Sequence, residues 1–232
     1  MLLKVTSLSA GDGNKEVVHD FSVAVNEAEV VGLIGHNGAG KTTALKAIYG
    51  VLKPFGGEIV YGNESITARS PSANVKGGIF LLPQERYIFP DMSVKENLQL
   101  ASGIQRRREE LEQELERVYK WFPVLRARAN QAAEHLSGGE RRMLGIGMAL
   151  MVKPKLLMLD EPSLGLSPLL VRSLNGIISG IARGGVGMIL VEQNVKQALS
   201  LSNRVYVLRG GRIVLEDTGQ NLLEKGEWWN LF

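Results

Sequence analysis

Apolar and polar positions along the chain follow two different periods. From Val17 to Val25 the odd positions are mostly apolar, the period-two signal of a half-buried strand, and we expect an antiparallel N-terminal sheet here. Residues 30–34 then read as a short buried strand. Residues 41–49 favour a helix that ends at Gly50. The predicted order is therefore strand, glycine-rich loop and helix.

Short apolar runs typical of buried strands return further along the chain, at residues 79–82, 156–159 and 188–191. A helical stretch around residues 169–181 separates the last two runs. Strands that alternate with helices predict a parallel sheet with crossover helices, and therefore an α/β fold. Near the end of the chain, residues 204–208 and 212–216 flank Gly210-Gly211, a two-residue turn that suits a β-hairpin.

The middle of the chain has a different pattern. Between Val94 and Val152 the strand signal disappears, and apolar residues recur at spacings of four, three and four: Leu111, Leu115, Val118 and Phe122. This is the pattern of an amphipathic helix. We interpret the block as a helical subdomain, residues 85–152, inserted into a core of residues 1–84 and 153–232, because the core needs strands from both halves.

Composition narrows the setting. The 232 residues are 44% hydrophobic and 22% charged, as in an ordinary globular protein, and no run of about 18 apolar residues predicts a membrane span. The start of the chain lacks a signal-peptide pattern and the chain has no cysteine, so we expect a cytoplasmic protein without disulfides or thiolate metal sites. The three histidines, His19, His36 and His135, lack metal-ligand spacing.

Charge does not favour a nucleic-acid partner. The net charge of +3 is mild, and Arg106-Arg107-Arg108 is the only dense basic run. No aromatic residues interleave with this run, as they would on a surface that stacks bases. We therefore interpret it as the solvated start of a helix rather than a nucleic-acid patch.

The loop after the strand at residues 30–34 matches the pattern G-x-x-x-x-G-K-[ST]. Its glycines let backbone N–H groups surround phosphate oxygens, and the following helix adds its positive dipole end. Lys41 then places a charge near the β and γ phosphates, and the Thr42 hydroxyl is a candidate Mg²⁺ ligand. A merely flexible loop is the alternative, which the flanking strand and helix disfavour. The predicted nucleotide-binding residues are Gly35, His36, Asn37, Gly38, Ala39, Gly40, Lys41, Thr42 and Thr43.

Two acids, Asp160 and Glu161, follow the apolar run at residues 156–159. The carboxyl end of a buried parallel strand is where α/β sheets bind ligands, so both acids should lie beside the phosphate loop. Asp160 is then placed to hold Mg²⁺, and Glu161 to orient and deprotonate an attacking water. The alternative is a pair of solvated acids at a strand end.

A second glycine-rich turn, Leu136 to Glu140, opens another predicted helix. This pentapeptide resembles the signature motif of ABC ATPases. In that family two ATPase subunits pair head to tail, and the signature of each closes over the γ-phosphate held by the other. The form S-x-x-E also fits a helix capping box, and the two interpretations are compatible. The residues expected to act in trans are Ser137, Gly138, Gly139 and Glu140.

The resemblance extends to about Gly219 and implies a P-loop NTPase (RecA-like) core that hydrolyses ATP with Mg²⁺. Gln84 falls at the family's Q-loop glutamine, which senses the metal and the γ-phosphate, and residues 163–168 occupy the D-loop. Gln193 stands where most of the family has histidine. The resemblance thus implies Glu161, Lys41 and Gln193 as catalytic residues. It implies Thr42, Gln84 and Asp160 as metal ligands.

Residues 160–168 and 191–194 resemble the smaller ATPase subunit of branched-chain amino acid importers and of their urea or amide relatives. Several features besides Gln193 depart from the usual pattern, among them the segment from Gln84 to Phe89, whose glutamine is closer to the urea-type relatives. Asp12 replaces the aromatic residue that stacks on adenine, which should relax discrimination among nucleotides. The tail with Trp228-Trp229 resembles nothing familiar; it is interpreted as tail packing, with a docking surface as the alternative.

The resemblance also implies partners. The chain should work as a homodimer, or as a heterodimer with a second ABC ATPase subunit, on the inner face of the cell membrane. Separate permease subunits would carry the solute, which a solute-binding protein would deliver. Two alternatives stay open from the sequence: a soluble ABC-type ATPase that is not coupled to transport, and a nucleotide-binding module with weak hydrolysis. In such a transporter the permease and solute-binding partners decide the solute, because the ATPase subunit never touches it.

Overall fold

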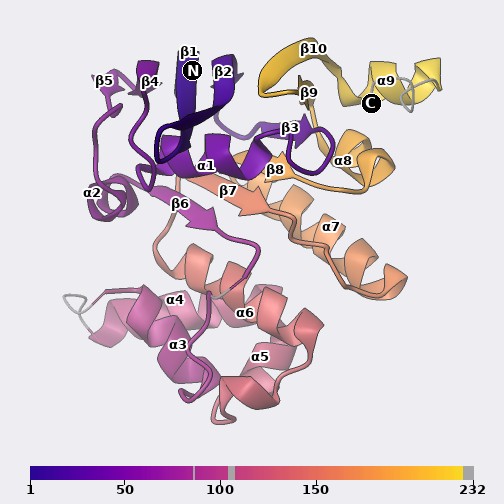
Figure 1. The fold of residues 1–232 in the computed structure, drawn as a ribbon. Coiled ribbons are helices and arrows are strands. Elements are labelled where there is room, and N and C mark those ends of the chain that lie inside the picture. Colours follow the sequence, from indigo (N-terminus) through magenta and orange to yellow (C-terminus); the bar gives the residue numbers. More distant parts are fainter. Residues whose placement is uncertain (86, 104–107, 227–232) are drawn as a thin grey trace.

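A computed structural model of the protein describes residues 1–85, 87–103 and 108–226 (Figure 1). Most of the basic run, Arg106 and Arg107, and the tail tryptophans, Trp228 and Trp229, lie outside the described residues. None of the helices within the described ranges is both long and apolar enough to cross a membrane.

The described chain contains two sheets and the helices that cover them. The strands are β1 (Leu3–Asp12), β2 (Lys15–Val25), β3 (Val30–Ile34), β4 (Gly56–Tyr61), β5 (Glu64–Ser65), β6 (Ile79–Leu82), β7 (Leu156–Asp160), β8 (Gly187–Val191), β9 (Arg204–Arg209) and β10 (Arg212–Thr218). The helices are α1 (Lys41–Tyr49), α2 (Pro71–Lys76), α3 (Val94–Ala101), α4 (Arg108–Trp121), α5 (Pro123–Ala127), the 3₁₀ turn Ala133–His135, α6 (Gly138–Met151), α7 (Pro168–Arg183), α8 (Val195–Leu201) and α9 (Gly219–Lys225).

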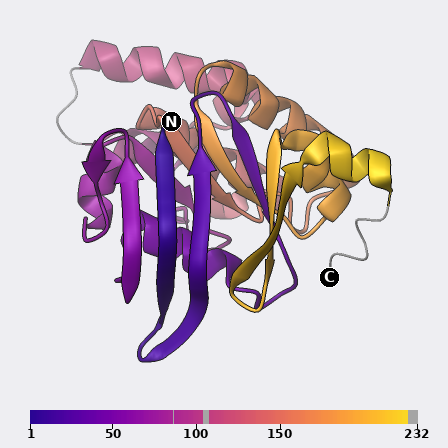
Figure 2. The same cartoon turned by 90° about the horizontal axis from the view of Figure 1, so that it is seen from above.

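The larger sheet has the strand order β10-β9-β3-β8-β7-β6. Five of its strands, β9, β3, β8, β7 and β6, run parallel to one another. The sixth, β10, pairs with β9 at the edge as the second strand of an antiparallel hairpin. The smaller sheet, β2-β1-β4-β5, is antiparallel. Figure 2 shows the indigo and purple strands of this smaller sheet side by side. The expected α/β fold with an antiparallel N-terminal sheet is confirmed.

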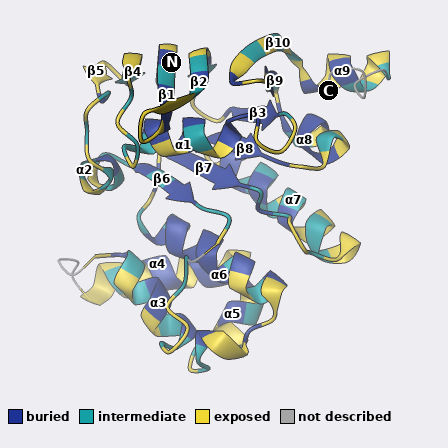
Figure 3. Cartoon of the chain, in the orientation of Figure 1, coloured by how far each residue is buried: buried dark blue, intermediate teal, exposed yellow. Residues whose placement is uncertain are grey.

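The parallel sheet separates two apolar layers because its side chains alternate between its faces. Leu156 and Met158 of β7 pack towards α1 and the N-terminal sheet. Leu157 and Leu159 pack on the other face, against α7 and the helices α3–α6. Figure 3 shows these central strands buried throughout, while the outer faces of the helices are exposed. The helices inserted between β6 and β7 therefore share one apolar layer with the sheet.

The hairpin β9–β10 turns at Gly210-Gly211, as the sequence predicts. Both glycines have positive φ, 55° and 78°, which a two-residue hairpin turn of this kind demands. A Cβ on Gly211 would also lie 2.1 Å from the carbonyl oxygen of Val17. This turn therefore packs directly on β2.

The alternation predicted for residues 17–25 holds only from Phe21 onward. Leu8 of β1 pairs with Phe21, yet Ala10, two residues further, pairs with Val18, three residues back. The extra residue of β2 is a β-bulge, and Asp20 within it has a φ of 49°. Because a bulge reverses the phase of a strand, Val18 is buried and Val17 is turned half outward. The prediction that Val17 faces the core is wrong.

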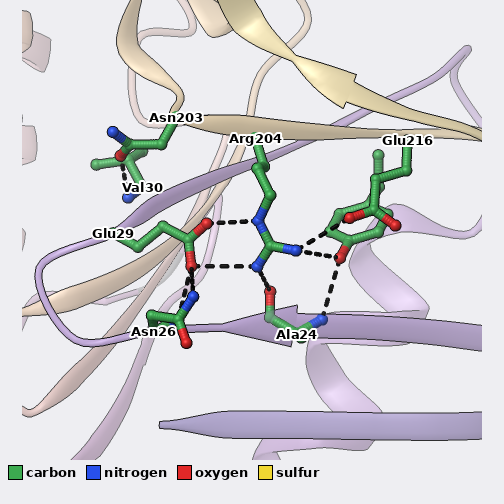
Figure 4. A network of polar contacts seen from close by, with 8 residues as sticks. Ala24, Asn26, Glu29, Val30, Asn203, Arg204 and Glu216 are labelled. Carbon is green, nitrogen blue, oxygen red and sulfur yellow. Dashed lines mark hydrogen bonds and ion pairs between the residues drawn. The ribbon is translucent and has the colours of Figure 1, made fainter. Parts of the chain in front are cut away.

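Arg204, the first residue of β9, joins three parts of the fold (Figure 4). Its guanidinium donates to both carboxylate oxygens of Glu29, at 2.6 and 3.2 Å, and to the carbonyl of Ala24 at 2.9 Å. It also reaches the Tyr206 hydroxyl at 3.1 Å and Glu216 at 3.0 Å. The network ties the end of β2 and the β2–β3 connection to the β9–β10 hairpin. It thereby holds the N-terminal sheet against the parallel sheet.

Candidate active site

The glycine-rich loop of residues 35–40, which matches the phosphate-binding pattern, curls between β3 and α1. Gly38 and Gly40 have φ values of 80° and 104°, a region that glycine enters without strain. Gly40 is the N-cap of α1, and among the described residues no side chain caps this helix end. The first backbone N–H groups of α1 are therefore available to an anion, with the positive end of the helix dipole behind them.

Lys41 lies inside this curl. Its ammonium donates to the carbonyl of Gly35 at 2.7 Å and to that of His36 at 3.0 Å, and the residue is only 5% exposed. Burial lowers the pKa of Lys41, while the nearby carboxylates of Glu161 and Asp160 act in the opposite direction. The side chain is thus held with its charge at the mouth of the loop, where a phosphate would sit.

Asp160 ends β7 directly beneath the start of α1. The Thr42 hydroxyl donates to Oδ2 of Asp160 at 2.8 Å, and the aspartate is 4% exposed. Its other oxygen, Oδ1, is buried and has no hydrogen-bond partner among the described residues. Burial raises the pKa of Asp160, opposed by the Thr42 hydrogen bond and by Lys41. An unsatisfied carboxylate oxygen beside a hydroxyl is the donor set that suits a hard divalent cation such as Mg²⁺.

Glu161 follows at the carboxyl edge of the sheet with an unusual backbone. Its φ is 49°, in the left-handed region where a non-glycine residue is strained. Its N–H donates to the carbonyl of Val191 in β8 at 2.9 Å, which holds this geometry in place. The Gln84 side chain, just after β6, donates to Oε2 of Glu161 at 3.1 Å. Three neighbouring strands thus position one amide–carboxylate pair.

These groups surround a hollow of about 350 Å³. Its lining consists of Val17, Asn37, Gly38, Gly40, Lys41, Thr42, Thr43, Gln84 and Glu161. Eight of the residues predicted from the sequence thus line one hollow, whereas Gln193 and residues 137–140 do not line it. Val17 was missed, because only the bulge in β2 turns it toward the hollow. The period-two pattern contains no signal for that bulge.

Gln193 lines a neighbouring cavity rather than this hollow. It lines a cavity of about 930 Å³ that Glu161 also borders, together with Ser163 and Glu192. Glu192 is 2% exposed and accepts from the Ser163 backbone at 3.1 Å and from its hydroxyl at 2.7 Å. Burial raises the pKa of Glu192 to about 7, although the Ser163 hydrogen bonds oppose the shift. Sequence reasoning missed Glu192, even though an acid at the end of a buried strand is the signal that identified Asp160.

Ser137 is the N-cap of α6, which lies in the helical block below the parallel sheet in Figure 1. Its hydroxyl accepts from the Glu140 N–H at 3.3 Å, and the Glu140 carboxylate accepts from the Ser137 N–H at 2.9 Å, so the capping box is formed. Arg128 pairs with Glu140 at 2.8 Å. Within the described chain, none of residues 137–140 lines the hollow around Lys41. Ser137 is exposed.

Asp12 lies at the exposed end of β1, where it pairs with Lys15 across the β1–β2 turn. It is not among the residues that line the hollow. The structure thus brings no aromatic ring to this place within the described part of the β1–β2 turn.

Comparison with known proteins gives a consistent result. The sequence profile of the family described as "ABC transporter" matches residues 18–164. The high-affinity branched-chain amino acid transport ATP-binding protein BraG of Pseudomonas aeruginosa is 42% identical, with 96% of this chain and 95% of that protein covered. The lipopolysaccharide export system ATP-binding protein LptB of Haemophilus influenzae is 34% identical, with 96% and 92% covered. The probable branched-chain amino acid transport ATP-binding protein LivF of Archaeoglobus fulgidus is also 34% identical, with 96% and 94% covered.

Solved structures agree on the fold. The ADP conformation of an ATP-binding cassette of an ABC transporter superposes with a TM-score of 0.88 at 25% identity, and 99% of this chain and 97% of that one are covered. A dimeric cassette in a post-hydrolysis state, bound to ADP and Pi, has a TM-score of 0.82 at 21% identity, with 94% and 98% covered.

Proposed function

This chain belongs to the ABC transporter family, and we propose that it is the ATP-hydrolysing subunit of an importer for branched-chain amino acids or a related small polar solute. The observation that carries the proposal is one contact. Gln84 donates to Glu161 at 3.1 Å at the rim of the hollow that Lys41 and Thr42 also line. A sensing amide, a base and a phosphate-binding loop therefore meet where a γ-phosphate would lie.

We assign the binding step to the loop and to α1. ATP would place its phosphates against the free N–H groups of α1, and Lys41 would exchange the Gly35 and His36 carbonyls for phosphate oxygens. Thr42, Asp160 and Gln84 would hold Mg²⁺, and the unsatisfied Oδ1 of Asp160 supports this fit. When bound, the ion neutralises charge that develops on the transferred phosphoryl group.

Hydrolysis is then mostly positioning and charge stabilisation. Glu161 would orient the attacking water and accept its proton. Gln84 keeps that carboxylate aimed at the hollow until the phosphate and metal arrive. Gln193, at the border of the neighbouring cavity, would donate a hydrogen bond to the γ-phosphate, although an amide cannot carry the charge of an imidazolium.

The proposed working form is a head-to-tail dimer, with a second copy or with a related ATPase subunit. Ser137 is exposed and does not line the hollow of its own chain, so its hydroxyl O–H and the α6 N-terminus can donate to a phosphate held by the partner. We propose that residues 85–152 move as the helical subdomain against residues 1–84 and 153–232. Permease subunits would take up this movement at the cytoplasmic face of the membrane, and a solute-binding protein would supply the solute.

The choice of solute rests on the relatives. BraG is 42% identical to this chain, against 34% for LptB, which favours import of branched-chain amino acids over lipopolysaccharide export. The alternatives that the sequence leaves open, a soluble ABC-type ATPase and a weakly hydrolysing module, gain no support from the relatives.

The proposal is tested by Glu161→Gln, an isosteric change that removes the base. We expect ATP hydrolysis to fall by at least about a hundredfold, while ATP binding stays within a few fold, because the group acts mainly in the transition state. The variant should also trap an ATP-dependent dimer in gel filtration with Mg-ATP. Equal hydrolysis rates for wild type and variant would contradict the enzymatic role. Co-purification with permease subunits, followed by uptake of labelled leucine in reconstituted vesicles, tests the transport role.

A further inference from the structure

Arg142 is a buried arginine that the proposed mechanism does not use. It lies on α6 and is 5% exposed. Its guanidinium donates to the backbone carbonyls of Pro83 at 3.3 Å and of Gln84 at 3.2 Å. It also lies over the Tyr87 ring, 4.9 Å from the ring centroid. The Arg142 side chain thus contacts Pro83 and Gln84 through hydrogen bonds and Tyr87 through its ring.

Gly145, one turn further along α6, packs against the same Tyr87 ring. A Cβ on this glycine would lie 2.6 and 2.7 Å from two atoms of the Tyr87 ring. Real contacts of a Cβ are never this short, so the ring lies directly on the helix backbone. Tyr87 is therefore held between the guanidinium of Arg142 and the bare backbone at Gly145. We call these three residues the Tyr87 clamp.

The chemistry of Arg142 is unusual for a purely structural residue. Among the residues that the structure describes, its hydrogen-bond partners are neutral carbonyls, and the carboxylates of Asp160 and Glu192 interact with its charge without a direct ion pair. Burying a charge on neutral partners carries a desolvation penalty that an apolar residue of similar volume would avoid. What the arginine contributes is geometry, because its planar guanidinium donates to two consecutive carbonyls and fixes their orientation.

The clamp connects two groups that act on different nucleotides. Gln84 has its carbonyl held by Arg142 and its amide on Glu161, at the hollow of its own chain. Ser137, five residues before Arg142, caps the same helix and is exposed. The stretch between them is rigid, since Arg141 donates to the Leu136 carbonyl at 2.9 Å and the capping box fixes the first turn. These contacts give a continuous path from Gln84 to the end of α6 that carries Ser137.

We propose that Arg142, through the Tyr87 clamp, is a positioning residue that sets Ser137 for the partner's ATP according to the state of Gln84 at its own site. The inference rests on the proposed function, because it requires the head-to-tail dimer. It differs from a general packing role in that it predicts a defect in dimer closure without a defect in binding of ATP to the single subunit.

The test uses the Glu161→Gln background, in which closed dimers accumulate. Arg142→Lys keeps the positive charge and loses the fork that holds the two carbonyls. We expect the ATP-dependent dimer of Glu161→Gln/Arg142→Lys to be weaker by about tenfold or more, since a hydrogen bond to a charged group is worth at least one such step. Affinity of the monomer for a fluorescent ATP analogue should change less than about twofold.

A matched pair of glycine substitutions keeps the test independent of Arg142. Gly145→Ala forces the Tyr87 ring off α6. Gly147→Ala, on the same helix, meets the methyl groups of Val118, Leu98 and Leu125, at 3.0, 3.1 and 3.4 Å, inside the helical block and not the Tyr87 ring. We expect Gly145→Ala to weaken the dimer as Arg142→Lys does, and Gly147→Ala to leave it intact.

Three results decide the matter. A weakened dimer with unchanged ATP affinity in both Arg142→Lys and Gly145→Ala supports the clamp. Full dimer formation in either variant, or an equal loss in Gly147→Ala, overturns it while the proposed function stands. Absence of an ATP-dependent dimer in Glu161→Gln itself counts against the proposed function, and the inference then fails with it.

Discussion

The hydroxyl of Thr42, at the start of α1, donates to Oδ2 of Asp160, at the end of β7, across 2.8 Å. The two residues are far apart in sequence, and the contact joins the phosphate loop to the acidic strand end. It leaves Oδ1 of Asp160 buried and unsatisfied among the described residues. The Thr42 hydroxyl and the Asp160 carboxylate together form an incomplete set of ligands for a divalent cation.

Asp160→Asn should abolish Mg²⁺-dependent hydrolysis, with a loss of about a hundredfold or more, because an amide oxygen is a weaker ligand for a hard cation. Hydrolysis measured over a Mg²⁺ titration checks this. Thr42 offers a matched pair. Thr42→Ser keeps the hydroxyl and should stay within a few fold of wild type, whereas Thr42→Val should lose activity. Full activity of Thr42→Val would exclude the hydroxyl as a ligand.

Glu192 predicts a pH dependence of stability. Its pKa is raised to about 7 by burial, above the ordinary value of 4.5. Such a group favours the folded state below pH 4.5, and this contribution is lost as the pH rises through 7. Glu192→Gln removes the ionisation. The variant should gain stability relative to wild type between pH 5 and pH 8, by up to about 3 kcal/mol.

Denaturant unfolding of both proteins at pH 5, 6, 7 and 8 measures that difference. Glu134→Gln, at an exposed residue, is the control and should show no comparable trend. A constant difference between Glu192→Gln and wild type across the range would mean that Glu192 does not titrate there. Sharing of the effect with Glu134→Gln would point to a general charge effect instead.

Arg204 should be a large contributor to stability. Arg204→Ala leaves Glu29 buried without its bidentate partner and should lower the free energy of unfolding by about 2–3 kcal/mol. Arg204→Lys keeps the charge and should lose roughly half as much, since the fork that reaches Glu29, Ala24 and Glu216 is gone. Arg209→Ala, at the exposed end of β9, is the control. Chemical unfolding that finds both alanine variants equal would contradict the role of the network in Figure 4.

Asp12 predicts weak recognition of the base. A stack of a base on an aromatic ring is worth about 1–3 kcal/mol, and Asp12 offers none. Wild type should therefore hydrolyse ATP and GTP with similar KM values. Asp12→Tyr should lower the KM for ATP, by about tenfold at this stacking energy. Asp12→Asn, which adds no ring, should leave KM unchanged, and an equal effect of both substitutions would mean that charge rather than stacking decides.

Much of the fold follows from local pattern. The buried runs coincide with β3, β6, β7 and β8, and α1 begins at Lys41 and ends before Gly50 as expected. These elements are short-range in cause: an apolar run, a glycine that permits positive φ, and an amphipathic period each act within one segment. The phosphate loop and the acids at the end of β7 were also predicted, since both depend on position at strand ends.

The sequence by itself therefore determined the element order, the glycine-rich loop before α1 and the acidic strand end, because those signals are local. Tertiary structure alone decided which side chains meet. The bulge at Asp20 turned Val17 toward the hollow, Gln84 reached Glu161 from another strand, and the bare backbone of Gly145 received the Tyr87 ring. Each of these depends on register and packing between segments distant in the chain, which no periodicity within a single segment encodes.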